Sequence, residues 1–147
     1  MRENTPTLNW RQKKQIESEV KSVLDSIFEK ASRLDTDVIS QYYSPHLVVV
    51  RDTSIFDFQA WNKAWIDFMN YTSSFKWTAA HWDCIVITND FVVSSLVGKM
   101  EYLMKSGEKT TIDPISWAYV LKKIDGQWKI IYDNYSGIHV TQKAEQK

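Results

Sequence analysis

The sequence contains one cysteine, Cys84, and only four glycines and three prolines among its 147 residues. A single cysteine cannot form a disulfide within the chain, nor can it build a metal cluster held by cysteine ligands. Cys84 stands in an apolar stretch typical of a strand, where we expect a buried, unreactive thiol. Internal repeats, low-complexity segments and linkers are also missing, so we expect one domain over residues 1–147.

Neither sign of charge is in excess. The chain has 18 Lys and Arg residues against 18 Asp and Glu residues, and no basic stripe stands out. Nucleic-acid-binding proteins need such a stripe to neutralise phosphates, so we expect no nucleic-acid partner. Residues 1–9 are polar, unlike a signal peptide, and no apolar run is long enough to span a bilayer. We therefore expect no membrane association and a cytoplasmic location.

Motifs for metals and cofactors are missing as well. The three histidines, His46, His81 and His139, lie in different predicted elements and show no metal-ligand spacing. The sequence has no glycine-rich phosphate loop, nucleophile elbow or Cys–His pair. We therefore expect no metal and no cofactor, and any chemistry should be acid–base work by Asp, Tyr or His side chains.

Aromatic residues, in contrast, are dense. The chain holds seven Trp, seven Tyr and six Phe residues, and 44% of all residues are apolar. A domain of this size can bury some of these rings in its core. The remainder must line a pocket, form a subunit interface or lie exposed. This surplus is the main indication of function.

Helical periodicity is confined to the first half of the chain. Apolar residues at spacings of three and four predict a helix of about 25 residues that ends near Leu34, with Thr7 or Asn9 as its N-cap. A short helix is expected over about 37–43, and a third over about 59–71.

Strands dominate the second half. A β-branched run at 47–50 predicts a buried strand, and four long strands are expected at 75–88, 91–105, 109–123 and 127–138. Tight turn signals separate the four long strands, so they should pair as antiparallel hairpins. Gly98 inside one of them indicates a bulge or bend, and residues from about Val140 should form a frayed tail. The order of elements predicts an α+β fold, with a curved antiparallel sheet wrapped around the helices.

The segment from Asp125 to Ser136, with the sequence DGQWKIIYDNYS, resembles the closing hairpin of the nuclear transport factor 2-like superfamily. The similarity is greatest to its SnoaL-like and calcium/calmodulin-kinase-association-like branches, and the order of elements agrees over nearly the whole chain. Tyr132 and Asn134 stand where histidines are common in those proteins. The resemblance implies a cone-shaped α+β barrel with an internal pocket, often paired as a homodimer through the outer face of the sheet. It does not decide the chemistry, because the superfamily contains isomerases, cyclases, hydrolases and scaffold subunits.

Side-chain alternation alone does not choose the pocket face of the last two strands, because both faces are partly apolar. The hairpin register of the kinase-association-like relatives implies that Tyr119 and Tyr135 point inward, with Trp117 and Asp133 beside them. The places where those relatives carry carboxylate-binding arginines are occupied here by tyrosines and, near the third, by Gly98.

The expected ligand-binding set combines aromatic and acidic residues. Trp65 and Phe68 are assigned first to the core, with a second role as pocket wall; the full set is Tyr43, Asp52, Trp65, Phe68, Trp117, Tyr119, Asp133 and Tyr135.

Three functions remain open from the sequence. The first is a binding protein for an apolar or aromatic small molecule. The second is a cofactor-free isomerase, cyclase or hydratase, with Asp52 or Asp133 as base and Tyr119 as hydroxyl donor. The third is a homodimeric assembly module without a ligand. An enzyme should place one pocket carboxylate against a hydroxyl donor in apolar surroundings that raise its pKa.

Overall fold

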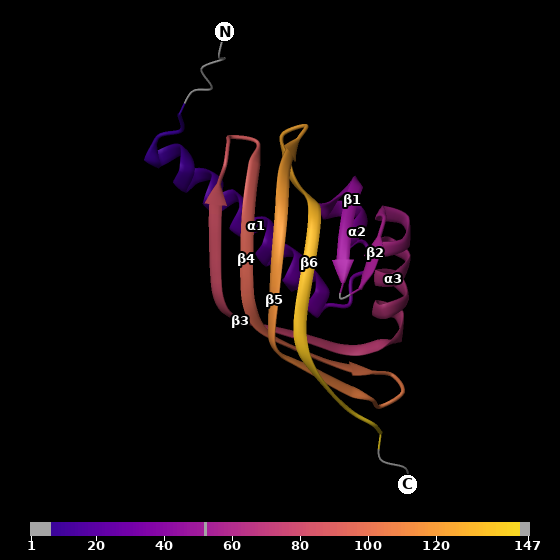
Figure 1. Cartoon of the computed structure of the whole chain (residues 1–147). Coiled ribbons are helices and arrows are strands. Elements are labelled where there is room, and N and C mark those ends of the chain that lie inside the picture. Colours follow the sequence, from indigo (N-terminus) through magenta and orange to yellow (C-terminus); the bar gives the residue numbers. More distant parts are fainter. Residues whose placement is uncertain (1–6, 52, 145–147) are drawn as a thin grey trace.

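The computed structural model describes residues 7–51 and 53–144. Its elements, in chain order, are α1 (Trp10–Ser32), α2 (Val38–Tyr42), β1 (Tyr43–Arg51), β2 (Ser54–Phe56), α3 (Phe58–Tyr71), β3 (Thr72–Val86), β4 (Phe91–Met104), β5 (Lys109–Ile124) and β6 (Gln127–Gln142). The strands form one sheet in the order β2-β1-β6-β5-β4-β3, which curves without closing (Figure 1). The predicted α+β fold with a curved sheet around helices is confirmed.

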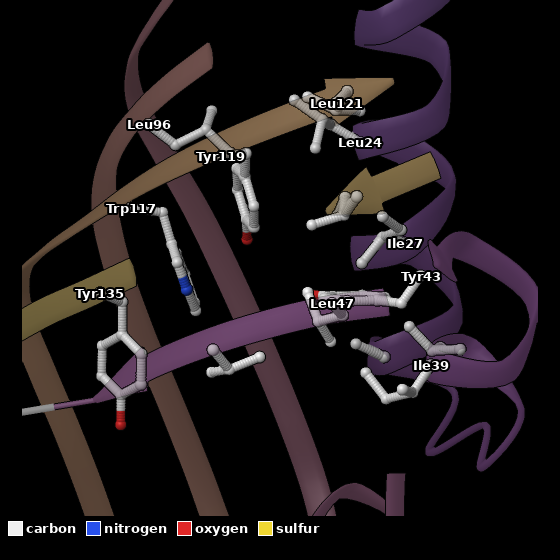
Figure 2. Packing of buried hydrophobic residues seen from close by; sticks show 14 of the residues in the cluster. Leu24, Ile27, Ile39, Tyr43, Leu47, Leu96, Trp117, Tyr119, Leu121 and Tyr135 are labelled. Carbon is white, nitrogen blue, oxygen red and sulfur yellow. The ribbon is translucent and has the colours of Figure 1, made fainter. Parts of the chain in front are cut away.

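The helix α1 lies across one face of the sheet, behind β3, β4 and β5 in Figure 1. It begins with a capping box, in which Asn9 Oδ1 accepts a hydrogen bond from Gln12 N and Gln12 Oε1 accepts one from Asn9 N. Its buried stripe is Ile16, Val20, Leu24, Ile27 and Ala31. This spacing of three and four turns one apolar face toward the sheet, where it joins the inward residues of the strands in a single core (Figure 2).

The four long strands pair as predicted. The pairs β3–β4, β4–β5 and β5–β6 are all antiparallel. At the last hairpin, Asp125 and Gly126 have φ angles of 51° and 78°, the left-handed conformation that a tight hairpin turn requires. The Asp-Gly turn signal therefore sets the pairing of β5 with β6, the two strands that carry most of the predicted site.

The sheet bends along a line that crosses three strands. Ala79, Gly98 and Ile115 are register partners, and pairing is irregular beside each of them. A Cβ atom on Gly98 would lie 2.4 Å from the carbonyl oxygen of Thr78 and 2.6 Å from the ring of Trp77. Gly98 thus lets two strands approach closely where the sheet turns, and the bend that the sequence predicts at this residue is confirmed.

Three features depart from the sequence expectations. The strand β1 begins at Tyr43 rather than near residue 47, and it pairs parallel to β6. The short strand β2 pairs antiparallel with β1 and has no counterpart in the expected elements. Residues from Val140 are not a frayed tail, because β6 continues to Gln142 and pairs with the start of β5. The start of β1 and the end of β6 pair with segments distant in sequence, which local patterns do not indicate, whereas β2 is too short to show an alternating pattern.

Within the part of the chain that the structure describes, no helix has the length and apolar character that a membrane span requires.

We predict that Gly98→Ala lowers the free energy of unfolding by about 1–3 kcal/mol, because the added methyl group has no space at the bend. Urea unfolding of the purified protein measures the change. Gly126→Asn is the control, since no atom lies within 4 Å of a Cβ at this position and Asn tolerates a positive φ. Equal stability of the Gly98→Ala variant and the parent protein would contradict the close packing described here.

Candidate functional site

A cavity of about 290 Å³ lies between the inner face of the sheet and the helices. The helix α1 contributes Ile27 and Phe28, and α3 contributes the rings of Trp61, Trp65 and Phe68. The wall is therefore mainly aromatic, with a few polar groups from the strands. Such a wall suits a flat apolar molecule that carries one or two polar substituents.

Seven of the eight predicted site residues line this cavity: Tyr43, Trp65, Phe68, Trp117, Tyr119, Asp133 and Tyr135. The eighth, Asp52, lies outside the described residues. Trp65 and Phe68, which the sequence assigns first to the core, are only partly buried and form part of the cavity wall. Trp65 is oriented by a hydrogen bond of 3.1 Å from its Nε1 to the carbonyl oxygen of Asp35.

Strand register brings the inward residues of β1, β6 and β5 into two rows. In one row Val49 pairs with Asp133, which pairs with Tyr119. In the next row Arg51 pairs with Tyr135, which pairs with Trp117. Figure 2 shows Trp117 and Tyr119 side by side on β5, with the Tyr119 hydroxyl pointing toward the space between Trp117 and Tyr43. Residues that are distant in sequence thus form one polar and aromatic surface.

A bulge in β6 decides which of its residues point inward. Trp128 and Ile130 are buried, and so are Asp133 and Tyr135, although strict alternation would place these two pairs on opposite faces. The pairing shifts at this point, because Leu121 is opposite Ile130 whereas Val120 is opposite Tyr132. The extra residue reverses the alternation and turns Asp133 into the cavity. Continuous alternation of side chains along the last strand is therefore interrupted between Ile130 and Asp133.

Asp133 is the acidic centre of the cavity. Its side chain is 1% exposed, and its Oδ2 accepts a hydrogen bond of 2.8 Å from the hydroxyl of Tyr43. Its Oδ1 is buried and has no hydrogen-bond partner among the described residues. Burial raises the pKa of Asp133 to about 6, while the Tyr43 hydrogen bond and the positive charge of Arg51 act in the opposite direction.

The two neighbouring tyrosines are neutral hydroxyl groups. Burial, followed by the negative charge of Asp133, raises the pKa of Tyr43 and of Tyr119 well above the usual value. Both hydroxyls therefore keep their protons over the physiological pH range. The Tyr43 proton is already donated to Asp133, and Tyr119 is a second hydroxyl beside the same carboxylate.

Arg51 is a site residue that the sequence analysis missed. Its guanidinium carbon lies 4.3 Å from the ring centre of Trp61 and 3.8 Å from that of Tyr135. The guanidinium is thus held between two aromatic rings, and its Nε is buried without a hydrogen-bond partner. Burial lowers its pKa, although the group remains a cation. The signal was present in the sequence, because Arg51 follows Leu47 and Val49 in the alternation of one strand face.

Unpaired polar atoms are concentrated at the cavity. Four buried side-chain nitrogen or oxygen atoms of the described residues lack a hydrogen-bond partner, and three of them belong to cavity-lining residues: Arg51, Trp61 and Asp133. Folded proteins rarely leave such atoms unpaired, so a concentration of them in one cavity indicates a binding site for a polar group. In the same described ranges, no three His, Cys, Asp or Glu side chains lie close enough to hold a metal ion.

The raised pKa of Asp133 has a consequence for stability. Between about pH 4 and pH 6 the folded protein holds a proton on Asp133 that the unfolded chain has lost, so stability falls as the pH rises through this window. Above about pH 6 the ionised carboxylate costs on the order of 2–3 kcal/mol. We predict that Asp133→Asn, which has a similar shape and no charge, is more stable than the parent protein near pH 8.

Urea unfolding at several pH values tests this prediction, and the advantage of the variant should vanish below about pH 4. Asp25→Asn is the matched control, because Asp25 is exposed on α1 and its ion pair with Lys21 is worth little. An Asp133→Asn variant that is less stable than the parent protein at every pH would contradict the assignment of a strained, ionised carboxylate.

Comparisons with known proteins agree with the architecture. A candidate scytalone dehydratase from Novosphingobium aromaticivorans superimposes with a TM-score of 0.81 at 8% sequence identity, covering 93% of each chain. A type 2 hexachlorocyclohexane dehydrochlorinase, LinA, superimposes with a TM-score of 0.74 at 7% identity, covering 95% of this chain and 97% of the other. A candidate calcium/calmodulin-dependent protein kinase II association domain from Xanthomonas campestris superimposes with a TM-score of 0.70 at 19% identity, covering 82% of this chain and 86% of the other.

At these identities the similarity establishes the fold alone. No curated protein sequence matches this chain. The model of the SnoaL-like domain family matches residues 20–141, which include α2, α3 and strands β1 to β5 in full, together with most of α1 and of β6. The chain therefore belongs to the SnoaL-like domain family, one of the two branches that its closing hairpin resembles.

Proposed function

We propose that this protein binds a small aromatic molecule in its cavity and acts on it as an acid–base enzyme of the isomerase or lyase type, without a cofactor. Asp133 is the proposed base. The observation that carries the proposal is the free Oδ1 of a buried carboxylate whose other oxygen is held by Tyr43. A carboxylate against a hydroxyl donor, in apolar surroundings that raise its pKa, supports this proposal.

The proposed chemistry divides among three groups. Above about pH 6 the Asp133 carboxylate is ionised, and its desolvated Oδ1 accepts a proton from the bound molecule. Tyr43 holds the carboxylate in position through Oδ2. Tyr119 keeps its proton and donates a hydrogen bond to an oxygen of the bound molecule on which negative charge develops.

Two of the similar structures bear the names of enzymes that remove water or hydrogen chloride, a dehydratase and a dehydrochlorinase. An elimination of this kind removes a proton as well as a leaving group, and a buried carboxylate base can take that proton. The likeness supports a lyase as one form of the proposal, and it leaves the identity of the substrate to experiment.

Asp52 is retained as a second candidate base. It directly follows Arg51 in the sequence. We propose for Asp52 the role that the sequence assigns to it, a base or a polar group that orients the bound molecule.

The acid–base proposal can be tested with nitrobenzisoxazole, a small aromatic compound whose ring opens in one step when a base removes a proton from carbon. A desolvated carboxylate in an aromatic cavity should accelerate this reaction, and the released phenolate is followed by its absorbance. We predict that the rate rises with pH through a midpoint near 6 and then levels off, following the ionisation of Asp133.

Two variants make this test specific. Asp133→Asn should lower the rate to that of the uncatalysed reaction, whereas Asp25→Asn should leave it unchanged. Tyr43→Phe removes a hydrogen bond that lowers the pKa of Asp133, so the midpoint should move to higher pH. An Asp133→Asn variant that retains the parent rate would exclude Asp133 as the base.

We also propose that two copies of the chain pair through the outer face of the sheet. Val97 and Ile85 are 37% and 61% exposed, and Val97 neighbours the buried, inward-facing Leu96 on β4. Large apolar side chains on an open sheet face commonly mark an interface with a partner. We predict that light scattering shows a dimer. The Val97→Asp variant should be monomeric, or its dimer should dissociate at a higher protein concentration than that of the parent protein, because a charge is placed in the interface. A monomeric parent protein would contradict the pairing.

A further inference from the structure

Arg51 has the features of a preformed receptor for an acceptor oxygen. Its guanidinium lies between the rings of Trp61 and Tyr135, at 4.3 Å and 3.8 Å from their centres. Two aromatic rings therefore pack against the cation, and its N–H groups donate hydrogen bonds along the edge of the guanidinium plane. The aromatic rings fix its plane before any ligand arrives, which lowers the entropy cost of binding.

The partner group, Asp133, lies on the same inward face of the sheet. Arg51 on β1 is in register with Tyr135 on β6, and Tyr135 is two residues beyond Asp133. Arg51 and Asp133 therefore lie on neighbouring strands, offset by two residues, or roughly 7 Å, along the strand direction. Arg51 Nε is an unpaired donor, and Asp133 Oδ1 is an unpaired acceptor. A molecule that carries an acceptor at one point and a donor at another would satisfy both atoms at once.

The charges of the cavity restrict the ligand further. Arg51 contributes one positive charge and the ionised Asp133 one negative charge, while the buried Tyr43 and Tyr119 stay neutral. An anionic ligand would gain from Arg51 but would be repelled by Asp133 in a cavity of low polarity. A neutral ligand meets no such penalty.

We propose that Arg51 and Asp133 form a two-point recognition site for a neutral aromatic molecule that carries both a carbonyl oxygen and a hydroxyl group. The carbonyl oxygen accepts hydrogen bonds from the edge of the Arg51 guanidinium, and the hydroxyl donates to Asp133 Oδ1. The aromatic ring lies among the rings of the cavity wall. This inference names the ligand class for the proposed function and rests on that function for its account of Asp133.

The test uses four matched probes and isothermal titration calorimetry at about pH 7, where Asp133 is ionised. Para-hydroxyacetophenone carries both groups, acetophenone lacks the hydroxyl, phenol lacks the carbonyl, and para-hydroxybenzoate is an anion. We expect para-hydroxyacetophenone to bind at least about 10-fold more tightly than each of the other three, because a hydrogen bond to a charged group is lost in two of them and charge repulsion is added in the last.

Variants assign the two contacts. Arg51→Met keeps an unbranched side chain of intermediate length and removes the guanidinium with its donors, so para-hydroxyacetophenone and phenol should then bind equally. Arg51→Lys keeps the charge but loses the planar edge, and we expect a smaller loss of the same preference. Arg33→Met is the matched control, because Arg33 is exposed on the surface and pairs with Glu29; it should bind all four probes as the parent protein does.

Two results would overturn the inference. Para-hydroxybenzoate that binds more tightly than para-hydroxyacetophenone would make the site an anion receptor. If both Arg51 variants still preferred para-hydroxyacetophenone to phenol as strongly as the parent protein does, Arg51 would not be the group that binds the carbonyl oxygen. If Arg51→Met does not fold, binding of the four probes to the parent protein and to Arg51→Lys still tests whether Arg51 recognises the carbonyl group.

The failures of the two proposals differ. Probe selectivity without base-catalysed opening of nitrobenzisoxazole supports the recognition site and contradicts the acid–base function. Ring opening that depends on Asp133, together with equal binding of all four probes, supports the function and contradicts the recognition site.

Discussion

A carboxylate held in an aromatic interior is the constraint around which the site is organised. Asp133 lies in the cavity wall with 1% of its side chain exposed, and burial alone disfavours its charge. The hydroxyl of Tyr43 and the positive charge of Arg51 offset part of this cost. The balance leaves the pKa of Asp133 near 6, a value at which the group can accept and release protons close to neutral pH. A chain that needed only a stable core would carry an apolar residue here.

Two features of the backbone place this carboxylate where it is. The parallel pairing of β1 with β6 brings Val49 beside Asp133 and Arg51 beside Tyr135. The bulge in β6 reverses the side-chain alternation between Ile130 and Asp133, so that the acid enters the cavity instead of the outer face. The pairing of β4 with β5 shifts beside Gly98, where the sheet bends, and the sheet curves around the helices (Figure 1).

The sequence predicts much of the architecture, because helical periodicity and turn residues are local signals. The stripe from Ile16 to Ala31 and the Asp125–Gly126 turn appear in the structure as expected. Seven of the eight proposed site residues line the cavity, largely because the resemblance of the closing hairpin supplied the register of β5 and β6. Periodicity alone could not do so, since the bulge in β6 leaves no mark in the pattern of residues. Alternation along β1 places Arg51 on the inward face, but its role depends on Trp61 and Tyr135, which contact it only in the folded chain.

The central claim is that an ionisable aspartate, Asp133, is buried in the wall of the cavity. The most direct measurement is an NMR titration of the aspartate carboxyl carbons in protein labelled with carbon-13, with the Asp133→Asn variant used to assign the signal. The account predicts that one aspartate, absent from the spectrum of the variant, titrates near pH 6. Titration of every aspartate carboxyl at or below about pH 4 would contradict it.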